Sequence, residues 1–107
     1  MAENIDDITV EYTEEDKLLV KQLEKHILTR GSWTTIMFKI QEMDKNTGNY
    51  GAPKVTIRRY QKRSGVFRQQ SKFNISSPKQ GLEISKKLVD WFSAEQGGGD
   101  GTENGDD

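Results

Sequence analysis

The chain of 107 residues contains no cysteine, two prolines and a single histidine. Without cysteine it has no disulfide, thiolate metal ligand or cysteine nucleophile, which fits a reducing compartment. No run approaches the roughly 18 apolar residues that span a bilayer, and no basic start leads into an apolar leader. These absences predict an intracellular protein, cytoplasmic or nucleoid-associated, and nuclear if the source is eukaryotic.

Residue patterns that carry enzymatic chemistry are also missing. The lone histidine, His26, falls in an apolar stripe, where a packed side chain is the common role. The sequence has no nucleophile elbow, Walker loop or dinucleotide fingerprint, and the acids at 100–107 lack the spacing of a calcium loop. We therefore expect no catalysis, no metal, no cofactor and no small-molecule substrate.

The net charge of −1 conceals a segregation of charge along the chain. Residues 1–30 and 81–107 are acidic, whereas residues 31–80 contain ten Lys/Arg and two Asp/Glu. The local field, and not the total charge, decides which ligands are attracted. The middle of the chain is thus a candidate surface for a polyanion.

Composition predicts one domain between two tails. Residues 1–12 and 96–107 are acidic and polar, so we expect both to be disordered and to stay outside the core. Residues 13–95 would then form a single domain with a modest core. The tails have two interpretations: they are solvated spacers, or they fold back on the basic middle as nucleic-acid mimics and reduce non-specific binding.

Periodicity predicts a helix over residues 14–30. Thr13 and the acidic run after it are typical of a helix start, because a hydroxyl cap and carboxylates favour the positive end of the helix dipole. Leu19, Leu23 and Ile27 recur at helical spacing, and a glycine follows at position 31.

Strands are predicted after this helix. Ile36, Phe38 and Ile40 alternate with less apolar residues, a second strand runs from Lys54 to about residue 62, and a third covers residues 66–75. Ser64-Gly65 predicts a tight turn between the last two. A fourth strand would need a bend within residues 33–52.

A second helix begins at a strong capping signal. Ser77, Pro78 and Gln80 together satisfy a capping box, and a broad apolar band follows. The expected fold is α+β: an N-terminal helix, a curved antiparallel sheet of three to four strands, and a C-terminal helix packed on one sheet face and at a dimer interface. From their spacing, Leu88, Trp91 and Phe92 belong to the core or to that interface.

The basic middle also contains aromatic rings. Single-strand binders combine cations that follow the phosphates with rings on which bases stack. No acid interrupts residues 54–75, whereas a merely solvated face usually mixes both signs. Trp33 either stacks on a base or anchors its strand, and a bulge would decide the face of Phe67. We predict that Lys39, Lys54, Arg58, Lys62, Arg68 and Lys72 contact phosphates, and that Tyr60 with Trp33 or Phe67 stacks on bases.

Two motifs, KVTIRRY at 54–60 and SKFNISSPKQ at 71–80, resemble those of the single-stranded-DNA-binding domain of the transcriptional coactivator positive cofactor four family. The likeness spans residues 33–92, with phenylalanine at position 73 where the family usually has glycine. It implies a homodimer in which helices meet and paired sheets form two antiparallel channels for single strands. On this resemblance Lys54, Arg58, Tyr60 and Lys72 lie on the binding face.

The predicted function is binding of single-stranded nucleic acid, with DNA favoured, in transcription or DNA metabolism. Affinity should fall steeply with salt, and sequence preference should be weak. Two alternatives remain: a protein-interaction module that docks an acidic partner, and a binder of double-stranded DNA or RNA. No residue identifies a contact to the 2′-hydroxyl, so DNA and RNA are not distinguished.

Overall fold

The computed structural model describes residues 2–94. Contacts divide the chain into two units, residues 1–75 and residues 76–107, and each is described by itself. Among the described residues, no helix has the length and apolar character needed to cross a membrane.

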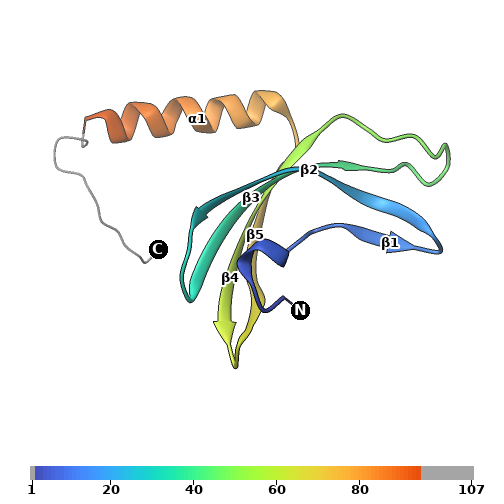
Figure 1. The fold of residues 1–107 in the computed structure, drawn as a ribbon. Helices are drawn as coiled ribbons and strands as arrows, with labels where there is room; N and C mark the ends of the chain where they lie inside the picture. The colour runs from blue at the N-terminus through green and yellow to red at the C-terminus, as the bar shows by residue number, and fades with distance from the viewer. Residues whose placement is uncertain (1, 95–107) are drawn as a thin grey trace. The chain divides into compact units, whose positions relative to one another are not determined.

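The first unit is a five-stranded antiparallel sheet in which each strand pairs with the next along the chain (Figure 1). The sheet curves, and a short 3-10 helix, η1 (Ile5–Asp7), lies within the curve (Figure 1). The strands are β1 (Tyr12–Glu14), β2 (Lys17–Thr29), β3 (Trp33–Glu42), β4 (Lys54–Arg63) and β5 (Val66–Ile75).

The N-terminal helix predicted over residues 14–30 is absent, and the prediction is wrong: most of this segment is β2. The sheet accordingly has five strands, not three to four. The apolar stripe of Leu19, Leu23 and Ile27 has a spacing of four residues. That spacing fits one turn of a helix and also alternate positions of a strand, so it does not distinguish the two.

A β-bulge in β2 adds to this ambiguity. The register with β3 shifts between Gln22 and Glu24, and one extra residue reverses the alternation of a strand. Val20 and Ile27 therefore both pack against the core, although a regular strand would point residues seven apart to opposite faces. Seven residues are also two helical turns, so the bulged strand has a helix-like pattern.

The acidic run predicted to start that helix forms a hairpin turn. Glu15 and Asp16 have φ angles of 51° and 68° and connect β1 to β2. Positive φ at both central residues is what a type I′ turn requires, and this turn matches the twist of paired strands.

The predicted turn between the last two strands is confirmed. Ser64 and Gly65, with φ angles of 53° and 78°, join β4 directly to β5. Farther along the hairpin, the register shifts between Arg59 and Tyr60, so that Gln70 of β5 has no partner on β4. Because the extra residue reverses the alternation of the strand, this bulge determines which face each β5 side chain between the bulge and the turn points to.

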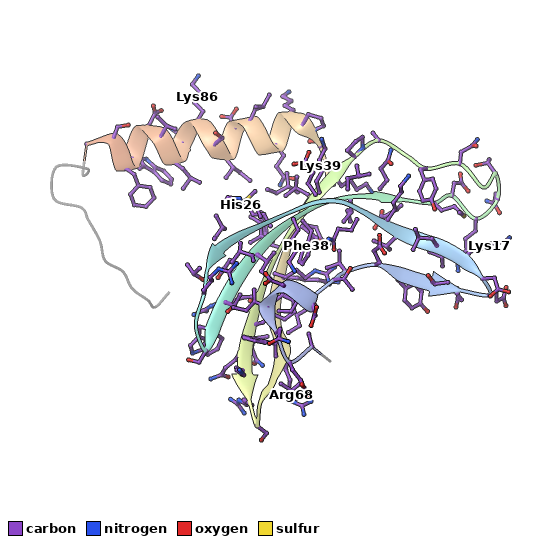
Figure 2. All side chains as sticks on the ribbon, viewed as in Figure 1. Lys17, His26, Phe38, Lys39, Arg68 and Lys86 are labelled. Atoms are coloured by element: carbon purple, nitrogen blue, oxygen red, sulfur yellow. The ribbon has the colours of Figure 1, made fainter. Side chains whose placement is uncertain are left out.

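The core lies on one face of the sheet, called the inner face below. Ile36, Phe38 and Ile40 of β3 point to this face, and Phe38 is completely buried (Figure 2). Tyr60 of β4 and Phe67 of β5 belong to the same apolar cluster. The other residues of these strands alternate onto the opposite, outer face.

The segment Ala2–Val10, called the N-terminal strap, completes the core. Composition predicts that residues 1–12 stay outside it, yet Ile8 and Val10 are core residues, only 5% and 9% exposed. Burying each of these side chains contributes about 1.5–3 kcal/mol. The tail predicted at 96–107 lies outside the described residues.

The second unit contains α1 (Pro78–Ser93), and its predicted start is confirmed. The Gln80 N–H donates to Ser77 Oγ at 3.1 Å, and the Ser76 N–H donates to Gln80 Oε1 at 3.3 Å. Proline at the first helical position loses no hydrogen bond there. The packing of this helix on a sheet face stays a prediction.

Candidate nucleic-acid interface

Two basic side chains face each other across the β4–β5 hairpin. Arg58 and Lys72 are cross-strand register partners on the inner face, and like charges directly opposite destabilise a sheet. Among the described residues, neither forms an ion pair with a carboxylate. An anion bound between the two strands would relieve this repulsion.

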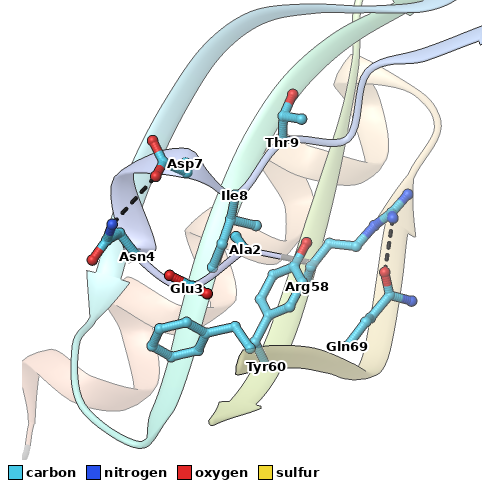
Figure 3. A pocket seen from close by; sticks show the side chains of 10 residues that line it. Ala2, Glu3, Asn4, Asp7, Ile8, Thr9, Arg58, Tyr60 and Gln69 are labelled. Atoms are coloured by element: carbon cyan, nitrogen blue, oxygen red, sulfur yellow. Dashed lines mark hydrogen bonds between the residues drawn. The ribbon is translucent and has the colours of Figure 1, made fainter. Parts of the chain in front are cut away.

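Neutral groups hold the Arg58 side chain in place. Its Nη1 donates to Gln69 Oε1 at 2.9 Å, and its Nε donates to Thr56 Oγ1 at 3.1 Å (Figure 3). Thr56 in turn donates to Asn74 Oδ1 at 2.7 Å. The guanidinium is therefore oriented without losing its net charge, as an anion-binding group requires.

Lys62 extends the positive charge toward the hairpin turn. It is exposed, and its ammonium lies 5.4 Å from the centre of the Phe67 ring. Alternation along β4 puts Lys62 on the same face as Arg58. Together with Lys72, these side chains form what we call the inner-face cations.

The two rings predicted to stack on bases are buried. Tyr60 is 6% exposed and Phe67 is 5% exposed, because both pack in the core. Burial raises the pKa of Tyr60 above its usual value, although the charge and a hydrogen bond of Arg58 oppose this. In this conformation neither ring offers a face to a base.

Two of the predicted phosphate contacts are already neutralised. Lys54 Nζ lies 2.8 Å from Glu42 Oε1, and Lys39 Nζ lies 4.0 Å from Glu24 Oε2. Both pairs are exposed, so each is worth little to stability. They nevertheless lower the local positive potential, which leaves these lysines less suited to phosphates than the inner-face cations.

Three predicted site residues lie on the outer face instead. Trp33 and Lys39 alternate with the core residues of β3, and the bulge in β5 turns Arg68 away from Lys72. Trp33 packs against Arg59, with the guanidinium carbon 4.3 Å from the ring centre. The nine predicted residues therefore divide into six on the inner face and these three on the outer face.

The N-terminal strap crosses the inner face beside the inner-face cations. The Phe67 N–H donates to the Ala2 carbonyl at 2.8 Å, and this pair forms an isolated antiparallel bridge. Glu3 and Asp7 of the strap line the same cavity as Arg58, and Figure 3 shows Asp7 bonded to Asn4 and the Arg58 side chain directed toward Gln69. An acidic segment thus lies on the basic surface that the sequence predicts for nucleic acid.

Lys25 anchors this strap, a role that no sequence pattern predicts. Its Nζ donates to the carbonyls of Ile5, Asp6 and Ile8 at 2.8, 3.1 and 2.8 Å. Burial lowers the pKa of Lys25, while the charges of Asp6 and Asp7 oppose the shift. The isoleucines within the acidic segment were the available signal that it packs on the core, because a tail that stays in solvent does not bury apolar side chains.

Strap residues line open cavities among the described residues. One, of about 600 Å³, has Arg58, Tyr60 and Gln69 among its lining residues (Figure 3). Another, of about 650 Å³, is lined partly by Arg30 and Lys62. Strap residues line both cavities, and Phe67 borders both.

No family model, curated protein or solved structure matches this chain. The likeness to the positive cofactor four family therefore rests on the sequence motifs alone.

Proposed function

We propose that the protein is a non-enzymatic binder of single-stranded nucleic acid whose inner face captures phosphates. The observation that carries this proposal is the cross-strand pair of Arg58 and Lys72, neither of which has a carboxylate partner within residues 2–94. A sheet has no structural need for two facing cations, whereas a phosphate between them forms charge-assisted hydrogen bonds with both.

The curvature of the sheet favours a single strand over a duplex. Reading a duplex requires an element that enters the major groove, usually a helix or a two-stranded ribbon. The inner-face cations lie instead within the curve of the sheet, and only a flexible backbone follows such a surface easily. The motifs shared with the positive cofactor four family support the same ligand.

The experiment is a comparison of three labelled ligands by fluorescence anisotropy at low salt: oligo-dT, the matched RNA and the matched duplex. We expect single strands to bind about tenfold more tightly than duplex, a difference of about 1.4 kcal/mol. Replacing Arg58→Ala and Lys72→Ala together should weaken single-strand binding about tenfold or more. The charge-matched control is Lys86→Ala with Lys87→Ala on α1, which should bind like the wild type.

Two other results would contradict the proposal and favour a different function. Equal or tighter binding of the duplex would favour a double-strand binder. The strap itself is an acidic peptide on this face, so an acidic protein partner is the second candidate. Capture of such a partner that survives nuclease treatment, without measurable binding of any oligonucleotide, would favour a protein-interaction module.

We also propose that the protein lies inside the cell, in the cytoplasm or with the nucleoid, and cell fractionation would test this location.

We further propose that two copies pair through α1. Leu88, Trp91 and Phe92 are 44%, 63% and 62% exposed, and their spacing places them on one side of the helix. A contiguous exposed apolar band of this kind marks an interaction surface. A second copy of the same helix would cover it.

Sedimentation velocity tests the pairing. Replacing Trp91→Ser and Phe92→Ser together should convert dimers to monomers, because most of the buried apolar area would be lost. Leu82→Ser is the control, since Leu82 is also exposed but points about a third of a turn away from Leu88. A wild-type chain that sediments as a monomer at micromolar concentration would contradict this pairing.

A further inference from the structure

The N-terminal strap occupies the proposed binding face, and we infer that its first part, Ala2–Asp7, is an acidic lid that competes with nucleic acid. This inference rests on the function proposed above and adds its regulation. In the closed state, Glu3 and Asp7 share the lining of one cavity with Arg58. In the open state, the two covered rings become available to bases.

The strap has two parts with different attachment. Ile8 and Val10 are core residues, so removing them would cost several kcal/mol of apolar burial. Ala2–Asp7, in contrast, contains no fully buried residue. The first part can therefore lift while Ile8 and Val10 remain in the core as the anchor.

Polar contacts hold the lid closed together with the partly buried side chains of Ala2 and Ile5, which pack against the core. The polar contacts are the hydrogen bond from the Phe67 N–H to Ala2, the Lys25 ammonium on the carbonyls around η1, and an exposed ion pair of Arg30 with Asp6 at 3.6 Å. A phosphate backbone would instead form charge-assisted hydrogen bonds with Arg58 and Lys72 on the same face.

Lifting the lid would restore the rings that the binding face otherwise lacks. Ala2 pairs with the Phe67 backbone, and Tyr60 and Phe67 both border the cavity beneath the strap. Base stacking on an aromatic ring is worth about 1–3 kcal/mol. The open state thus supplies both parts of single-strand recognition, the cations and the rings, whereas the closed state supplies the cations only.

The test replaces Lys25→Met, which keeps the length of the side chain and removes its three bonds to the strap. The variant loses a positive charge, so electrostatics alone predict weaker binding of a polyanion. If the strap acts as a lid, the affinity should change in the opposite direction. We expect the affinity for oligo-dT to rise about tenfold, which is within the usual range of coupling between sites. Lys86→Met on α1 carries the same change of charge and should bind no more tightly than the wild type.

A second variant covers the case in which Lys25→Met does not fold. Glu3→Gln with Asp7→Asn removes two lid carboxylates and should also tighten binding, whereas Glu83→Gln with Asp90→Asn on α1 changes the net charge equally and should not. Hydrogen exchange of the wild type gives an independent measurement. The Asp7 and Ile8 amides donate to the carbonyls of Asn4 and Ile5, and saturating oligo-dT should speed their exchange.

The possible failures can be distinguished. If the wild type and Lys86→Met bind oligo-dT but Lys25→Met binds no more tightly, or if oligo-dT slows exchange at the strap, the lid is wrong and the proposed function stands. If no variant binds any oligonucleotide, the proposed function fails and the lid fails with it.

Discussion

Phe38→Ala should lower the free energy of unfolding by about 3–5 kcal/mol, the usual cost of removing a buried aromatic ring. Phe38 of β3 is completely buried and belongs to the inner-face cluster together with Ile8 and Val10 of the strap. Native domains have total stabilities of about 5–15 kcal/mol, so the variant should lose a large fraction of its stability. Urea denaturation followed by circular dichroism would measure the loss.

Phe73→Ala is the matched control, because the same side chain is removed from a strand of the same sheet. Phe73 is 49% exposed and lies opposite Ile57 on the outer face. Its replacement should cost about 1 kcal/mol, mainly from the strand preference of phenylalanine. Similar losses for the two variants would show that the inner face is not the main core.

The second large effect is on the salt dependence of binding. Each phosphate neutralised on a single strand contributes about −0.7 to the slope of log affinity against log salt. The three inner-face cations therefore predict a slope near −2, so affinity should fall about a hundredfold for a tenfold rise in salt. Anisotropy titrations with oligo-dT at several salt concentrations would give the slope.

Replacing Arg58→Ala and Lys72→Ala should reduce that slope to about −0.7, because one of three phosphate contacts remains. The control with Lys86→Ala and Lys87→Ala should keep the wild-type slope despite the same loss of charge. A slope that changes equally in both variants would mean that the net charge of the chain, and not the inner face, attracts the nucleic acid.

Several parts of the fold could be predicted because their signals act within a few residues. Ser64-Gly65 supplies the positive φ angles of a two-residue turn. Ser77 and Gln80 form the hydrogen bonds of a helix cap. Arg58 and Tyr60 lie on one side of β4, as strand alternation requires, but that side is the core face and not a solvent-facing one.

The candidate site was predicted less completely than the fold of the hairpin. Its cations on β4 and Lys72 share a face, which the sequence indicated only as an implication of the family resemblance. The burial of Tyr60 and Phe67 was missed, because residues far away in the sequence cover them. Composition also gave no indication that Lys25 binds three carbonyls of the strap, since its partners lie 17–20 residues away.

The sequence by itself determined the β4–β5 hairpin, the start of α1 and the basic character of the middle segment, because turns, caps and charges are local properties. Only the tertiary structure decided three other features. Pairing with β3 made residues 17–29 a strand, one bulge turned Arg68 outward, and burial of Ile8 drew an acidic segment onto the basic face. Each of these features depended on contacts between residues distant in the sequence. The spacing of apolar residues alone does not distinguish the alternative structures.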